Sequence, residues 1–97
     1  MDLRFVWNDQ KASDNLRKHG VGFVEAATVL SDPLSLTIPD PAHSFGEARW
    51  IDIGRSSVGR LLVVVYTEVE TEKATVVRII SARIPDPDER QVYEEGH

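Results

Sequence analysis

The fold is decided by the stretch RLLVVVYTEVETEKATVVRIISAR, residues 60–83. Its first part, residues 60–67, is a continuous apolar and β-branched run, which is typical of a central strand covered on both faces. Residues 75–83 form a second segment rich in β-branched side chains. The polar, acidic residues 68–73 separate the two. We therefore expect two neighbouring strands of one sheet at 60–67 and 75–83.

Three further segments are predicted to be strands because apolar and polar side chains alternate in them. They are Leu3–Trp7, Leu34–Ile38 and Arg49–Ile53. A turn at Ser56–Gly59 separates the last of these from the run at 60–67. The final three strands therefore form a meander.

Three helices are expected. The first, Gln10–His19, follows the capping residues Asn8 and Asp9 and ends at Gly20, which suits a left-handed C-terminal position. Its Ala12, Leu16 and His19 fall on roughly one helical face. The second is Phe23–Leu30, with apolar side chains at helical spacing. The third begins with Asp86 at the N-cap, Pro87 at the first turn and Glu89 three residues after the cap, and runs through Glu95.

This element order places too few helices between strands for a parallel, doubly wound sheet. It predicts one α+β domain over residues 1–97, with a small antiparallel β-sheet. Two N-terminal helices and one C-terminal helix are expected to pack on one side of that sheet.

The charge of the chain is −5, from 11 basic and 16 acidic residues. Residues 84–97 alone carry −4, so the rest of the chain is almost neutral and nucleic acid is not excluded as a partner. The longest apolar run, Leu61–Tyr66, is six residues, far below the roughly 18 needed to span a bilayer. We expect no membrane helix. The N-terminus lacks the pattern of a signal peptide, so we expect a cytoplasmic location.

Several kinds of chemistry have no support in the sequence. The three histidines, His19, His43 and His97, are widely separated and there is no cysteine, so no metal site is predicted. The Gly20–Gly22 segment lacks the third glycine of a dinucleotide loop, and no nucleophile elbow surrounds Ser56 and Ser57. No cofactor is expected.

Five arginines lie within or at the ends of the expected strands: Arg49, Arg55, Arg60, Arg78 and Arg83. Two interpretations are open. Each arginine could keep the sheet soluble or pair across to an acid such as Glu68, or several could converge on a phosphate, which guanidinium grips in a bidentate manner. Strict alternation places Arg78 and Arg83 on opposite faces unless the strand bulges or ends between them.

His19 is the second candidate group. It follows Arg17 and Lys18 near the end of a helix, where the helix macrodipole stabilises a cation. The alternative is a capping or packing histidine. Tyr93 and Glu94 on the last helix are equally consistent with an anchor and a solvated acid.

The sequence resembles the BrnT toxin family from about Phe5 to Tyr93. The most specific segments are Lys18–Gly20 and Arg78–Arg83. The likeness extends over Trp7–Ala12, Asn15–Val21, Phe23–Ala27, Gly46–Trp50, Ile53–Ser56, Leu62–Thr67 and Arg78–Arg83.

The resemblance implies a toxin of a bacterial type II toxin–antitoxin pair with a RelE/ParE-like fold, acting as a ribonuclease that stops translation. It implies a BrnA-like antitoxin as protein partner and RNA as substrate. Contact with DNA would be indirect, through the antitoxin.

Metal-free RNA cleavage needs a base for the ribose 2′-hydroxyl, cations for the pentacoordinate phosphorane and an acid for the leaving oxygen. With the resemblance, His19 becomes the expected acid or base, Arg49 and Arg78 the transition-state clamps, and Arg83 a catalytic-site phosphate contact. Substrate contacts are expected from Lys18, Arg55 and Tyr93, with Lys18 and Tyr93 as RNA-positioning or proton-donating groups. The alternative is a protein-binding module of the same fold that has no catalytic activity.

One segment departs from the family pattern. Family members tend to carry a basic last helix, whereas this chain carries the acidic stretch 84–97 there. A negative segment beside a substrate phosphate repels RNA by an amount that falls with salt. We therefore expect this segment to weaken RNA binding by this chain.

Overall fold

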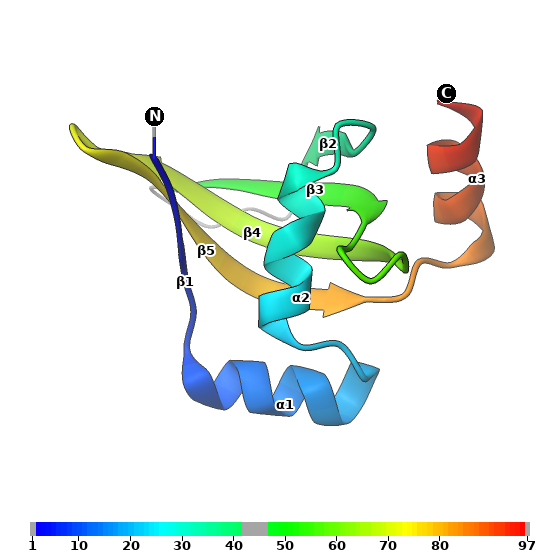
Figure 1. Cartoon of the computed structure of the whole chain (residues 1–97), viewed down its shortest axis with the longest axis horizontal. Helices are drawn as coiled ribbons and strands as arrows, with labels where there is room; N and C mark the ends of the chain where they lie inside the picture. The colour runs from blue at the N-terminus through cyan, green and yellow to red at the C-terminus, as the bar shows by residue number, and fades with distance from the viewer. Residues whose placement is uncertain (1, 42–46, 97) are drawn as a thin grey trace.

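The computed structural model describes residues 2–41 and 47–96, which form one sheet and three α-helices (Figure 1). Element bounds in chain order are β1 Asp2–Val6, α1 Asp9–His19, α2 Phe23–Thr28, the 3₁₀ helix η1 Val29–Ser31, β2 Leu36–Pro39, β3 Ala48–Arg55, β4 Leu61–Glu70, β5 Ala74–Arg83 and α3 Pro87–Glu95. Within the described ranges, no helix is long and apolar enough to cross a membrane.

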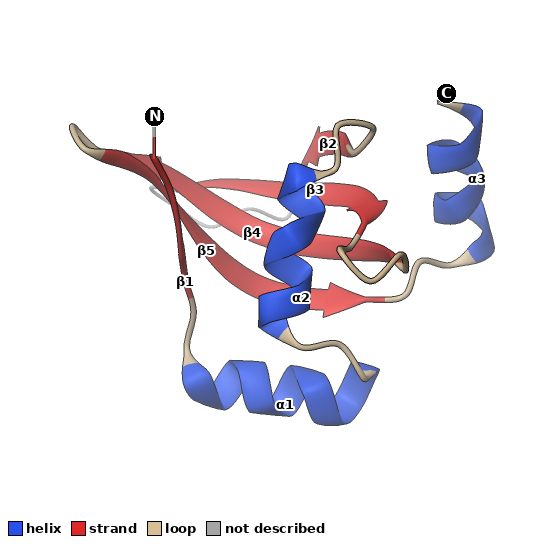
Figure 2. Cartoon of the chain, viewed as in Figure 1, coloured by secondary structure: helices blue, strands red, loops and turns tan. Residues whose placement is uncertain are grey.

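The five strands lie in the order β1-β5-β4-β3-β2 (Figure 2). The predicted meander β3-β4-β5 is confirmed, and β2 extends it as a fourth antiparallel strand. The prediction of a purely antiparallel sheet is wrong, because β1 pairs with β5 in parallel. An alternating pattern of side chains is the same in parallel and antiparallel strands, so the sequence of β1 carried no information about its direction.

One face of the sheet, which we call the helix-covered face, packs against α1 and α2. Its buried core joins residues of β4 and β5 to residues from α2 and its flanks: Leu62, Val64, Tyr66, Val77, Ile79 and Ala82 meet Val21, Phe23, Ala26 and Val29. This layer is the main hydrophobic core.

The prediction that all helices pack on one side is also wrong. Tyr93 of α3 is 5% exposed and packs with Ile53, Leu61 and Val63, which project from the face opposite α1 and α2. Burial of this aromatic ring accounts for the position of α3, because Tyr93 is the one buried residue of this short acidic helix.

A β-bulge interrupts β5. Tyr66 pairs with Ile79 and Val65 pairs with Ser81, so Ile80 is an extra residue on β5. A bulge shifts the alternation of side chains by one residue beyond it. Ala82 therefore returns to the helix-covered face, and Arg83 lies on the opposite one.

Helix ends follow the predicted capping chemistry. The Asn8 side chain accepts a hydrogen bond from the Lys11 N–H (3.0 Å), and Gly20 ends α1 at φ +70°. Asp86 and Glu89 form a reciprocal capping box at the start of α3. The second helix is shorter than predicted, because regular α-helix stops at Thr28 and gives way to η1.

The expected strands are present with different ends. The acidic connection 68–73 is partly strand, since β4 extends to Glu70 and pairs with the longer β5. The residues expected on one face of the first helix do not share one environment. Ala12 packs on the core, whereas Leu16 is 54% exposed. Side-chain spacing identified the helix but not the side that the sheet covers.

Candidate nucleic-acid interface

The face opposite α1 and α2 carries four of the predicted site arginines: Arg49 and Arg55 on β3, and Arg78 and Arg83 on β5. We call it the arginine face and define it by these residues. In the middle of it, Arg49 and Arg78 are the cross-strand neighbours of Thr67 on β4. Thr67 is buried between them. Two guanidinium groups thus flank one position of the central strand.

The bulge at Ile80 places Arg78 and Arg83 on the same face. Arg78 pairs with Thr67 and Arg83 pairs with Val63, two β4 residues separated by an even number of positions. Strict alternation had predicted opposite faces for the two arginines. The condition named from the sequence, a bulge between them, is met.

Arg78 is exposed and does not pair with Glu68. The residue opposite Glu68 on β5 is Val77, so the Glu68 side chain projects from the other face. Within residues 2–41 and 47–96, no hydrogen bond or ion pair engages the Arg78 side chain. This guanidinium is the most available cation of the arginine face.

Arg49 is held by a carboxylate at the edge of the sheet. Its Nε lies 2.9 Å from Asp40 Oδ2, at the point where the Asp40 N–H continues the β2–β3 ladder by donating to the Arg49 carbonyl. The ion pair fixes the stem of Arg49 along β3. Its charge is partly neutralised within the chain.

Arg83 forms a bidentate ion pair with Glu89 of α3. Arg83 Nη1 donates to Glu89 Oε1 at 2.7 Å, and Nη2 donates to Oε2 at 2.8 Å. The pair lowers the pKa of the Glu89 carboxyl and raises the pKa of the Arg83 guanidinium, mainly through these hydrogen bonds. The acidic last helix therefore contacts a predicted site residue directly.

Arg55 and Tyr93 lie together at the far end of the face, where α3 covers it. The Arg55 guanidinium sits 5.8 Å from the centre of the Tyr93 ring, and the Tyr93 hydroxyl donates to Asp32 Oδ2 at 2.8 Å. Burial and the neighbouring Asp32 raise the pKa of the Tyr93 hydroxyl. In this arrangement Tyr93 anchors α3.

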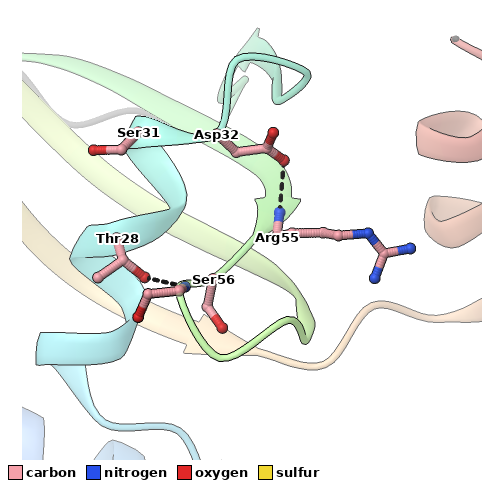
Figure 3. A pocket seen from close by; sticks show the side chains of 6 residues that line it. Thr28, Ser31, Asp32, Arg55 and Ser56 are labelled. Carbon is pink, nitrogen blue, oxygen red and sulfur yellow. Dashed lines mark hydrogen bonds between the residues drawn. The ribbon is translucent and has the colours of Figure 1, made fainter.

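A cavity of about 420 Å³ opens beside this anchor, between η1 and the turn that follows β3 (Figure 3). Two hydrogen bonds hold its walls together. The Arg55 N–H donates to Asp32 Oδ2 at 2.8 Å, and the Ser57 N–H donates to Thr28 Oγ1 at 2.9 Å. Four residues with hydroxyl groups and one aspartate line the cavity, and Arg55 is the one cationic residue in its lining.

His19 and Lys18 line a groove of about 220 Å³ between α1 and β5. Lys11, Asp14 and Asn15 complete the helix side of the groove, and Ile80 and Ser81 of the bulge form the strand side. Ser81 lines the groove and pairs with Val65, a β4 residue of the arginine face, so the groove lies beside that face.

Asn15, which lines the groove, hydrogen-bonds to the part of the β5 edge that β1 does not cover. Its amide nitrogen donates to the Ala82 carbonyl (2.8 Å) and the Val21 carbonyl (2.9 Å), and its oxygen accepts from the Ala82 N–H at 3.1 Å. Beyond the end of β1, the Asn15 side chain thus replaces a strand as hydrogen-bonding partner. The position of His19 and Lys18 beside the bulge depends on this contact.

The structure therefore separates the predicted residues into three places. The first place is the bulge: Arg78 and Arg83 flank it on β5, and His19 and Lys18 lie in the groove that Ile80 and Ser81 line. The second is β3, where Arg49 lies across Thr67 of β4 from Arg78. The third is the end of the face that α3 covers, where Arg55 contacts Tyr93 of α3. Arg60, the remaining strand arginine, lies outside the site because it pairs with Glu25 of α2 at 2.6 Å and lowers the pKa of that carboxyl.

Sequence reasoning missed Asn15, Lys11 and Ser81. The spacing of Lys11, Asn15 and Lys18 at four and three residues places them on one stripe of α1, which is a readable signal. No signal identified Ser81, since its exposure to the groove depends on the bulge.

The described residues contain no group of three or more histidine, cysteine or acidic side chains that could hold a metal ion. His43 and His97 lie outside the described residues, as does Gly46 of the resemblance. The groove beside the bulge offers the imidazole of His19, the ammonium groups of Lys11 and Lys18, the hydroxyl of Ser81, and the polar side chains of Asp14 and Asn15.

Comparison with protein families gives a match over most of the chain. The model of the family described as ribonuclease toxin, BrnT, of type II toxin–antitoxin system matches residues 7–89, which include every predicted site residue except Tyr93. The chain belongs to the BrnT toxin family. No curated protein matches the chain.

BrnT membership confirms the family predicted from the sequence. It indicates a ribonuclease toxin of a type II toxin–antitoxin system, and such a system includes a protein antitoxin as partner. The BrnT match ends at Glu89, so most of α3 lies beyond the matched segment.

Proposed function

We propose that this BrnT toxin is a metal-independent endoribonuclease that cleaves RNA at the bulge of β5 and thereby inhibits translation. A BrnA-like antitoxin would neutralise it, and contact with DNA would be through that antitoxin alone. The observation that carries the proposal is the bulge at Ile80, because it brings Arg78 and Arg83 to one face beside the groove of His19 and Lys18.

Each group fits one requirement of 2′-hydroxyl attack on a phosphodiester. His19 acts either as the base that takes the proton of the attacking 2′-hydroxyl or as the acid that protonates the leaving 5′-oxygen. Arg78, with no ion pair among the described residues, binds the non-bridging oxygens as negative charge develops on the phosphorane. Arg49 lies across Thr67 from Arg78 and contributes a second cation. Lys18 binds the adjacent backbone phosphate.

RNA binding is expected to be strongly salt-dependent. Each phosphate neutralised on a single strand contributes about 0.7 to the slope of log K against log salt concentration. Lys18 and Lys11 are exposed cations of the groove, and Arg78 is an exposed cation of the arginine face. Alanine at each should lower the slope, whereas alanine at Lys73, in the distant turn between β4 and β5, should leave it unchanged.

The decisive experiment is a cleavage assay with purified protein in EDTA. We expect the parent to cleave single-stranded RNA to products that end in 2′,3′-cyclic phosphate, and to leave RNA with a 2′-deoxyribose at the scissile position intact. His19→Ala and Arg78→Ala should slow cleavage and relieve growth arrest and translation block in cells. Lys73→Ala, which removes an exposed cation in the distant turn between β4 and β5, is the matched control. Equal activity of all four proteins would overturn the site assignment.

A second candidate function is a protein-binding module without catalysis. One observation favours it: Arg49 and Arg83 are each engaged by a carboxylate of the same chain, which reduces the charge offered to RNA. Purified protein that leaves RNA intact across a wide salt range, while still binding its antitoxin, would replace the proposal above with this one.

A further inference from the structure

We propose that Glu89 is a built-in competitor of RNA for Arg83, so that the first turn of α3 restrains RNA binding at the bulge. This inference rests on the proposed function, since it assigns the regulation of the same site. The ligand that Glu89 opposes is a phosphate of the RNA backbone.

The Glu89 carboxylate occupies the guanidinium in the way a phosphate would. Both terminal nitrogens of Arg83 donate to separate oxygens of Glu89, at 2.7 and 2.8 Å. Carboxylate and phosphate use the same parallel two-bond geometry on arginine. A phosphate that approaches this edge of Arg83 must therefore displace Glu89 or share the guanidinium with it.

Glu89 is held in this position by α3 itself. Its Oε1 also accepts a hydrogen bond from the Asp86 N–H at 2.9 Å, and the Glu89 N–H donates to Asp86 Oδ1 at 2.8 Å. The capping box therefore fixes the carboxylate next to Arg83 before any substrate arrives. Tyr93, packed on Ile53, Leu61 and Val63, prevents the helix from moving away as a whole.

The contact is specific to one arginine of the bulge. Arg78 lies on the same face and strand, and within the described part of the chain no carboxylate engages it. Glu94 lies on the same helix, but it is exposed and makes no side-chain hydrogen bond among the described residues. These two residues supply internal comparisons for an experiment.

Glu89→Gln is the sharpest variant, because glutamine three residues after the N-cap also completes a capping box. It removes the charge and keeps the helix start. The probe is a fluorescein-labelled single-stranded RNA with 2′-O-methyl riboses, which binds but cannot be cleaved. Binding is measured over a range of salt concentrations, with Glu94→Gln as the charge-matched control.

We expect Glu89→Gln to bind this RNA about three- to tenfold more tightly at low salt, as befits the loss of a partly exposed ion pair. The slope of log K against log salt should steepen, because Arg83 then contacts a phosphate. Glu94→Gln should show a clearly smaller gain. In an Arg83→Ala background, the effect of Glu89→Gln should disappear.

Equal or weaker binding by Glu89→Gln than by the parent would overturn the inference, as would a full gain that persists in the Arg83→Ala background. Circular dichroism of both variants checks that α3 is intact. The proposed function fails separately, through the absence of cleavage by the parent. Absence of binding by both the parent and Glu89→Gln would overturn both.

Discussion

The two faces of the same sheet differ in the side chains that they carry and in how far helices cover them. The helix-covered face is closed by α1 and α2, and nine apolar side chains of the core between them are at most 2% exposed: Val21, Phe23, Ala26, Val29, Leu62, Val64, Val77, Ile79 and Ala82. Among the described residues, α3 covers the arginine face at one end, and the face presents two arginines of β3 and two of β5. Alternation lets one strand contribute to both faces, so core residues and arginines are interleaved along the same strands.

The polar groups of the two faces differ in the same way. On the helix-covered face, Asp52 is 3% exposed and accepts a hydrogen bond from the Tyr66 hydroxyl at 2.9 Å. On the arginine face, Arg49 and Arg83 pair with carboxylates at its rim, and the Arg83 side chain is 42% exposed. A change on the first face should affect folding, and a change on the second should affect binding.

The largest expected effect is the loss of activity in Arg78→Ala. Removing one cationic clamp from the transition state costs on the order of 2–4 kcal/mol, which is about a hundredfold or more in cleavage rate. The thermal midpoint should stay close to that of the parent, since Arg78 is exposed and unpaired among the described residues. Single-turnover cleavage and thermal unfolding test both statements. A variant that unfolds at a much lower temperature would show that the arginine face also carries stability.

Asn15→Ala tests the edge of β5, where the Asn15 side chain hydrogen-bonds to the Ala82 backbone. The change leaves the buried N–H and carbonyl of Ala82 without their partner, which should lower the free energy of unfolding by about 2–4 kcal/mol. Urea unfolding measures the loss, and Ser13→Ala, an exposed change on α1, is its control. Parent-like stability would mean that the edge of β5 finds another hydrogen-bonding partner.

Asp86→Ala should have a smaller effect, confined to the helix on the arginine face. Loss of the N-cap hydrogen bond to the Glu89 N–H should lower the free energy of unfolding by about 1 kcal/mol. Asp88→Ala, in the same turn, removes an equal charge without a cap. If both variants lost the same stability, charge and not capping would be responsible.

Asp52→Asn should give the smallest change, visible as a pH dependence. Burial raises the pKa of Asp52 in the folded protein, so the folded state binds its proton more tightly than the unfolded chain does. Stability from this group is therefore present at low pH and is lost as pH rises through the raised pKa.

The asparagine variant removes that loss, so its stability relative to the parent should rise with pH above about 4. Unfolding in urea at a series of pH values measures the difference between the two proteins. Glu25 and Glu89 have lowered pKa values and act in the opposite direction, but they are common to both proteins and cancel. A constant difference across pH would contradict the prediction.

Much of the architecture could be read from local sequence. The β-branched run in β4, the caps at Asn8 and Asp86, and the stop at Gly20 each act within a few residues, so their physical causes are visible in the sequence. The family was predicted from motifs spread over the chain and is confirmed by the match to residues 7–89. The roles of the individual site residues remain predictions.

The remaining features depend on contacts between distant segments. The parallel direction of β1, the placement of α3 on the arginine face and the edge contact of Asn15 with Ala82 each join residues far apart in the chain. The spacing of residues within one segment therefore does not predict these contacts.

By itself, the sequence determined the strand and helix segments, their caps and the family, because propensity, capping and motif identity are local. Only the tertiary structure decided which arginines share a face. The bulge at Ile80 adds one residue to β5, and a shift of one residue exchanges the two faces of a strand. For this reason Arg83 lies with Arg78, within reach of Glu89.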